Sequence, residues 1–349
     1  MKRIILILIL ALLYATFALS QPFKNLIVGS PIEQMAYSPD SSLLAVASRE
    51  GLYLCDIERD ELRLLIKGYI VSVAFSPDGK MLAAGADWQN GLPDDWQNDQ
   101  HWRDDWQETI YIWDLQNEKQ TELKRHAGSV QSVSSICFSS DSKTLISGDL
   151  DGVWFWSIDR EQIIGQLALD NVYSFAYRHD GNMLAVGTYN TIFLVDPIGR
   201  KIHSVFSHRD EFIPELWILC IGFNPDWTIL ASGSGDNVVN LWDVSNLKRI
   251  EQLQHNGNVH FLSFTPDGRQ IVYAGWGRII RIYDMISKET ISWEGSYTIS
   301  SGALSPDGRT LATAGAEGII SFWEMPKPAT GIRSLNKKFG LWGSLKSGR

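Results

Sequence analysis

The chain has 349 residues, and 40 acidic side chains against 31 basic ones give it a net charge of −9 at pH 7. Overall charge does not draw an acidic chain of this kind to nucleic acid, so we expect no nucleic-acid partner. Cys55, Cys137 and Cys220 lie far apart with no Cys-x-x-Cys pair, which predicts free thiols rather than a disulfide framework or a metal site.

The first twenty residues have the order of a secretory signal. Lys2 and Arg3 precede an apolar stretch from Ile4 to Leu19, and small residues at Ala18 and Ser20 stand just before Gln21. We expect residues 1–20 to be a signal peptide that is cleaved before Gln21, which predicts a periplasmic or extracellular protein. The alternative is a retained membrane anchor, which usually needs about 20 apolar residues.

From there to residue 324 the chain repeats one pattern seven times. An apolar stretch ends in a large side chain, a turn of the Ser-Pro-Asp-Gly kind follows, and each copy closes on Trp-Asp or a related pair. The large residues before the turns are Tyr37, Phe75, Phe138, Tyr177, Phe223, Phe264 and Leu304. They are 38, 63, 39, 46, 41 and 40 residues apart, so one interval carries an insertion. A period of roughly 40–45 residues with this ending is typical of propeller blades.

Each copy is predicted to form strands. Val71, Val73 and Phe75 alternate with small residues, which is the period of a sheet. Pro followed by Asp-Gly predicts a hairpin between the first and second strands. A third strand ends in the Trp-Asp pair, and a more polar fourth strand follows, as at Glu61–Lys67. The small residue before each large one fits strands that crowd around a central axis.

The repeat resembles the WD-repeat family over residues 22–324. This resemblance implies an all-β protein, a seven-bladed β-propeller of four-stranded antiparallel blades, with the ring closed by an N-terminal strand at Phe23–Val28. Closing the ring leaves no unpaired edge strand, which would invite aggregation.

The same resemblance implies hydrogen-bonded sets of four side chains that hold a blade together. The fifth copy has His208, Ser232, Asp236 and Trp242, and the third copy has His126, Ser147, Asp151 and Trp156. The sixth copy keeps His255 but replaces the other three residues of the set.

The insertion and two long loops are the candidate binding rim. Residues 87–108 contain Trp88, Trp96, Trp102 and Trp106 among acidic residues, and the loop from His208 to Phe223 contains Phe212 and Trp217. The family's topology places these loops on one face, and aromatic residues with polar tips favour interfaces. The alternative is that the tryptophans of the insertion fold back onto the propeller.

The last segment, residues 325–349, is basic. It holds six Lys or Arg and no acid, with Ile332, Leu335, Phe339, Trp342 and Leu345 spaced three or four apart. Docking on the propeller, contact with an anionic membrane surface and disorder are the alternatives for this tail.

No residue pattern predicts catalysis, a metal ion or another cofactor. The sequence therefore favours a non-enzymatic scaffold that binds another protein through the loops of one rim. A carbohydrate-binding propeller that uses the Trp-rich insertion is the alternative, and a periplasmic propeller enzyme is the third hypothesis. The fold alone does not name the partner.

Overall fold

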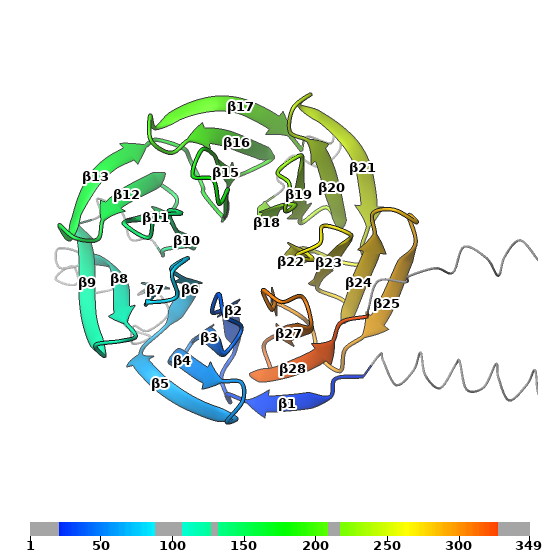
Figure 1. Cartoon of the computed structure of the whole chain (residues 1–349), viewed down its shortest axis with the longest axis horizontal. Helices are drawn as coiled ribbons and strands as arrows, with labels where there is room; N and C mark the ends of the chain where they lie inside the picture. The colour runs from blue at the N-terminus through cyan, green and yellow to red at the C-terminus, as the bar shows by residue number, and fades with distance from the viewer. Residues whose placement is uncertain (1–20, 88–106, 127–131, 209–216, 327–349) are drawn as a thin grey trace, which may run out of the picture.

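A computed structural model describes residues 21–87, 107–126, 132–208 and 217–326, and these form seven four-stranded sheets arranged in a ring (Figure 1). Residues 1–20, where a signal peptide is predicted, most of the insertion, Phe212 and residues 327–349 of the basic segment lie outside the described residues. Within the described part all regular structure is strand, and neighbouring strands in every sheet pair antiparallel. The prediction of a seven-bladed propeller is confirmed.

Six blades are continuous in sequence and follow one another around the ring. Blade 1 consists of β2 (Ile32–Tyr37), β3 (Leu43–Ser48), β4 (Gly51–Asp56) and β5 (Glu61–Lys67). Blade 2 consists of β6 (Ile70–Phe75), β7 (Met81–Ala86), β8 (Gln107–Asp114) and β9 (Lys119–His126). Blade 3 consists of β10 (Ser135–Phe138), β11 (Thr144–Gly148), β12 (Val153–Ser157) and β13 (Gln162–Leu167). Blade 4 consists of β14 (Ser174–Tyr177), β15 (Leu184–Gly187), β16 (Thr191–Asp196) and β17 (Lys201–Ser207). Blade 5 consists of β18 (Ile218–Phe223), β19 (Ile229–Ser234), β20 (Val238–Asp243) and β21 (Lys248–Gln254). Blade 6 consists of β22 (Val259–Phe264), β23 (Gln270–Gly275), β24 (Ile279–Asp284) and β25 (Thr290–Glu294).

Blade 7 joins the two ends of the propeller. It consists of β26 (Ser301–Leu304), β27 (Thr310–Ala314), β28 (Ile319–Glu324) and, as its outermost strand, β1 (Lys24–Ile27). β1 pairs antiparallel with β28, with Leu26 opposite Ile320. The predicted closure of the ring by the N-terminal strand is confirmed.

Apolar side chains fill the spaces between blades. Seven buried clusters each combine residues from two adjacent blades; the one at the closure, for example, packs Met35 and Val46 of blade 1 against Phe322 of blade 7. Burial is deepest in the second strands, such as β19, and least in the fourth strands, such as β5. The sheets therefore stack side by side around the axis, each blade supplying one wall of two interfaces.

Hydrogen bonds also link the innermost strands around the ring. At six of the seven blade junctions a side chain in or just before one first strand bonds the backbone in or just before the next: Gln34 to Val73, Ser72 to Val133, Ser134 to Val172, Ser174 to Ile218, Cys220 to Val259 and Ser300 to Ile32. At the junction of blades 6 and 7, Gly302 leaves room for the ring of Phe261, because a Cβ there would lie 2.6 Å from that ring.

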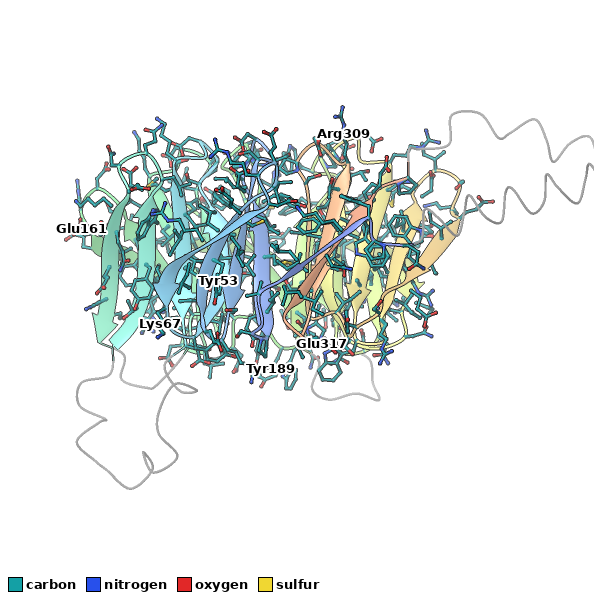
Figure 2. All side chains as sticks on the ribbon, turned by 90° about the horizontal axis from the view of Figure 1, so that it is seen from below. Tyr53, Lys67, Glu161, Tyr189, Arg309 and Glu317 are labelled. Carbon is teal, nitrogen blue, oxygen red and sulfur yellow. The ribbon has the colours of Figure 1, made fainter. Side chains whose placement is uncertain are left out.

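The ring has two faces of different construction (Figure 2). The loop face carries the connections from second to third strands and from fourth to first strands, and Tyr189 and Glu317 lie there. The turn face carries the connections from first to second and third to fourth strands, with Arg309 and Glu161. The candidate binding residue Trp217 immediately precedes β18, so it belongs to the loop face.

Candidate functional site

One position in every blade lines the mouth of the central channel on the loop face. A buried apolar residue stands at or just before the start of each first strand, and the residue after it lines the channel; these lining residues are Glu33, Val71, Ser134, Tyr173, Leu219, His260 and Ser300. In blades 1, 2, 5 and 6 the register shifts at this position. A β-bulge re-aims a side chain in this way. The channel lined by these strands has a volume of about 400 Å³.

A polar cluster occupies the mouth at blades 1 and 2. Tyr69 donates its hydroxyl hydrogen to Oε1 of Glu33 at 3.0 Å, and Nε of Arg49 donates to the same oxygen at 3.0 Å. The Arg49 guanidinium also lies 5.7 Å from the centre of the Tyr69 ring. Burial and then the Glu33 carboxylate raise the pKa of Tyr69 above its ordinary value, so it remains a neutral donor at physiological pH.

An aromatic trio, Tyr173, Tyr189 and Trp217, lies across blades 4 and 5. The ring centres are 5.4 Å apart for Tyr173 and Tyr189, 6.2 Å for Tyr173 and Trp217, and 6.5 Å for Tyr189 and Trp217. An isolated β-bridge joins the backbones of Tyr189 and Trp217. Trp217 is 44% exposed, so the trio presents apolar area to solvent while its own contacts hold the rings in place.

A second aromatic group, the pair His260 and Trp276, lies at blade 6. The His260 and Trp276 rings stack with centres 5.5 Å apart and an interplanar angle of 27°, and Trp276 is 52% exposed. Burial lowers the pKa of His260 below its ordinary value, so the imidazole is neutral at physiological pH. This neutral ring supports one face of the tryptophan without adding charge to the mouth.

The fifth-blade set is brought together as a connected network. Nδ1 of His208 lies 3.4 Å from the Asp236 carboxylate and Nε2 lies 2.7 Å from the Ser232 hydroxyl, which accepts a 2.8 Å hydrogen bond from Nε1 of Trp242. Burial would raise the pKa of Asp236, but hydrogen bonds from His208 and Ser234 outweigh it and lower the pKa. The imidazole is thus held between two partners, which is a structural role.

The third-blade set differs from the sequence assignment. Nε1 of Trp156 donates to Ser147 at 2.9 Å, but Asp151 is exposed, and the buried carboxylate of this connection is Asp149, which pairs with Arg125. Arg125 belongs to β9, the outermost strand of blade 2, whereas β17, the outermost strand of blade 4, has Ser207 at the corresponding place. The buried Arg125 cation attracts Asp149. The side chain of His126 lies outside the described residues, as do Trp88, Trp96, Trp102 and Trp106 of the insertion.

The described residues contain neither of two further features, a group of metal ligands and a membrane-spanning helix. They contain no group of three or more His, Cys, Asp or Glu side chains placed to hold a metal ion. In the same residues no helix is both long and apolar enough to cross a membrane. The three cysteines are free thiols, and burial raises the pKa of each of them.

Comparison with known families agrees with the geometry. A model described as "WD domain, G-beta repeat" matches residues 62–90 and 117–155, each match running from an outermost strand into the next blade. The chain is a WD-repeat propeller. Residues 215–318 of this WD-repeat propeller also match the model described as "Eukaryotic translation initiation factor eIF2A", over blades 5 to 7.

Individual relatives of the WD-repeat propeller cover parts of it. Periodic tryptophan protein 2 of Arabidopsis thaliana is 25% identical over 69% of the chain and 25% of its own length. Small ribosomal subunit protein RACK1 of Schizosaccharomyces pombe is 29% identical over 32% of the chain and 38% of its own length. Autophagy-related protein 16 of Arabidopsis thaliana is 24% identical over 55% of the chain and 47% of its own length. The chain thus spans less than half of each of these relatives.

Sequence reasoning missed most of the channel mouth. Trp217 was identifiable as part of a long loop, whereas Tyr173, Tyr189 and Trp276 stand in short connections that look ordinary along the chain. The signal that could have found Tyr173 is its place directly after the buried Val172, which matches Glu33 after Ile32 and His260 after Val259.

Proposed function

We propose that this WD-repeat propeller is a scaffold without catalytic activity that binds another protein through its loop face. The observation that carries the proposal is the aromatic trio of Tyr173, Tyr189 and Trp217, with a half-exposed tryptophan beside the channel mouth. Tryptophan and tyrosine dominate binding energy where they become buried at an interface. The names of the relatives, which include a ribosomal subunit protein and an autophagy-related protein, support protein partners.

The binding experiment compares two single variants with the parent chain. Trp217→Ala removes the exposed ring of the trio and is expected to weaken partner binding about tenfold or more. Ile198→Ala, which removes an 81% exposed side chain on the turn face, is expected to leave binding unchanged. Affinity capture from the native organism followed by quantitative mass spectrometry measures both, and equal recovery by all three proteins would refute the loop face as the binding site.

Carbohydrate recognition is the alternative for the same face. Exposed Trp217 and Trp276 rings could stack on sugar rings, with the Glu33 and Tyr69 cluster supplying polar groups. A glycan array separates the alternatives: retention of the parent chain but not Trp217→Ala on defined glycans would favour the carbohydrate ligand over a protein.

We further propose that the protein works outside the cytoplasm. The basic start, the apolar stretch and the small residues before Gln21 support export. N-terminal sequencing of exported material should begin at Gln21, whereas a protein that retains Met1 in a membrane fraction would support an anchor.

A further inference from the structure

The mouth of the channel on the turn face is apolar. A hollow of about 530 Å³ there is lined by Tyr177, Phe223 and Trp227 and by three prolines, Pro225, Pro266 and Pro306. The prolines occupy the same turn position in blades 5, 6 and 7, and all three are exposed. This mouth therefore offers a contiguous apolar surface that the packing of the blades does not cover.

Trp227 gives this mouth a side chain that no other blade has. Its backbone has a φ of 64°, and the equivalent turn positions hold Gly79, Gly181, Gly268 and Gly308 or the small Ser41 and Ser142. The ring contacts His179 and Phe223, with ring centres 5.7 and 6.3 Å apart, and the Arg178 guanidinium lies 5.9 Å from its centre. A bulky residue is unfavourable in this backbone region. The large apolar ring thus stands at the mouth despite a local backbone cost.

The described chain ends in a groove beside this mouth. A second hollow of about 510 Å³, between blades 6 and 7, is lined by three acidic side chains, Asp267, Asp307 and Glu324, by one basic side chain, Arg309, and by Met325 and Pro326. Pro266 lines both hollows, so they adjoin. The backbone amide of Met325 donates to the carbonyl of Arg309 at 2.8 Å, and the Met325 side chain is buried against blade 7. Pro326, the last described residue, therefore lies in the groove itself.

The charge of the turn face complements the residues that follow. Its turns hold 18 acidic and 9 basic residues. The turns counted are those between first and second strands, at 38–42, 76–80, 139–143, 178–182, 224–228, 265–269 and 305–309, and those after third strands, at 56–60, 114–118, 157–161, 196–200, 243–247, 284–288 and 324. Residues 327–349 hold six basic residues and no acid, with the apolar side chains of Ile332, Leu335, Phe339, Trp342 and Leu345 among them. Extended, 23 residues reach about 75 Å, so length does not limit where they bind.

We propose that residues 327–349, the basic tail, dock on the turn face of their own propeller. Basic side chains of the tail lie over Asp267, Asp307 and Glu324, and its apolar side chains enter the mouth at Trp227. This site is on the opposite face from the proposed partner site and does not rest on it. Any partner that uses the turn face with a basic, apolar segment must first displace the tail.

Limited trypsin digestion of the full chain tests the docking. Cleavage after Lys337 and Lys338, followed by mass spectrometry, reports how often the tail is free. In the double variant Asp267→Asn with Asp307→Asn, we expect cleavage at least threefold faster than in the parent chain. The matched control is Asp78→Asn with Asp141→Asn, because all four aspartates accept the same hydrogen bonds within their turns. The control should leave the rate unchanged.

A second variant tests the apolar half of the contact. Trp227→Gly removes the ring at a backbone conformation that glycine adopts readily, so the fold is retained and tail cleavage is again expected to accelerate. Equal rates in the parent chain and in both variants would overturn the proposal. Equal acceleration in the Asp78 and Asp141 control would also overturn it. Protection that grows with protein concentration would indicate docking on a second copy, and protection that requires added vesicles of anionic phospholipid would indicate a membrane; either result would overturn the proposal.

Discussion

His208 and His255 occupy the same place in adjacent blades, and their neighbours give them opposite energetic roles. The partners of His208 include Asp236 and Ser232, whereas in the sixth blade Tyr273 and Gly277 stand where those two would be. Both ring nitrogens of His255 are buried and make no hydrogen bond to a described residue. Burial, with the Arg281 charge as a smaller cause, lowers the pKa of His255 to about 4.

The fifth-blade network should contribute measurably to stability. His208→Ala removes one hydrogen-bond partner from the buried Ser232 hydroxyl and one from the largely buried Asp236 carboxylate, so we expect the free energy of unfolding to fall by about 1–3 kcal/mol. His203→Ala, at an exposed position of β17, should change it little. Urea denaturation of the three proteins measures the difference, and similar losses for both variants would show that the network is not a special source of stability.

His255 should make stability depend on pH. Because its pKa is about 4 in the folded state and near 6.5 when unfolded, the unfolded chain takes up the proton first as the pH falls. The folded protein is therefore most stable above about pH 6.5, where His255 is neutral in both states. Between pH 7 and pH 5 we expect the free energy of unfolding to fall by roughly 2 kcal/mol.

The variant His255→Phe removes this titration while keeping a ring beside Tyr273. Its free energy of unfolding should therefore fall less than that of the parent chain over the same pH interval, and His203→Phe serves as the control. An identical pH dependence in all three proteins would contradict the assignment.

Among the elements, β7 and β8 show how one blade accepts a long insertion. They pair in register from Met81 opposite Asp114 to Gly85 opposite Ile110, as the second and third strands of other blades do. The paired residues of these two strands lie outside residues 88–106. We therefore expect blade 2 to keep its strand pairing and its buried interfaces when the loop is changed.

Replacing residues 88–106 with a short Gly-Asn turn should leave the propeller folded. We expect an unchanged circular dichroism spectrum and a melting temperature close to that of the parent chain, while binding to the partner or glycan is lost. Thermal denaturation and the capture experiment measure the two effects. Unfolding on deletion would mean instead that the tryptophans of the insertion pack onto blades 2 and 3.

At the scale of the whole molecule, stability depends on a closed ring. β1 supplies the fourth strand of blade 7, and Leu26 packs on the cluster that joins blades 7 and 1. This strand pairs with the edge of β28 that would otherwise be the outer edge of blade 7. An uncovered edge would expose unpaired backbone groups and the apolar side chains beneath them.

Deleting residues 23–28 should therefore cause aggregation and lower the melting temperature. Point variants refine the test: Leu26→Asp puts a charge into the cluster and should destabilise the protein, whereas Ile27→Asp, at a side chain that is 71% exposed, should not. Size-exclusion chromatography and thermal denaturation report both effects. A deleted protein as stable and as monodisperse as the parent chain would show that β1 is dispensable.

The seven-blade fold could be predicted from the sequence because every blade carries its own local signals. Proline presets the backbone of the first hairpin, Asp caps it, and the alternation from Val71 to Phe75 marks the strand. The set around His208 was expected from the resemblance of the repeat to the WD-repeat family, whose four positions the fifth copy fills. Asp151 shows the limit, since a neighbouring blade supplies the Arg125 that selects Asp149 instead.

The sequence by itself determined the strands and their order, because these depend on spacing within each repeat, and its resemblance to the WD-repeat family predicted the closure of the ring. Only the tertiary structure decided which side chains meet at the two mouths of the channel. Tyr173, Tyr189 and Trp217 come from three connections in two blades, and Trp227 and Pro306 come from turns about 80 residues apart. Residues so distant meet because circular packing brings corresponding positions of all blades to one axis, and that proximity is a property of the ring rather than of any repeat.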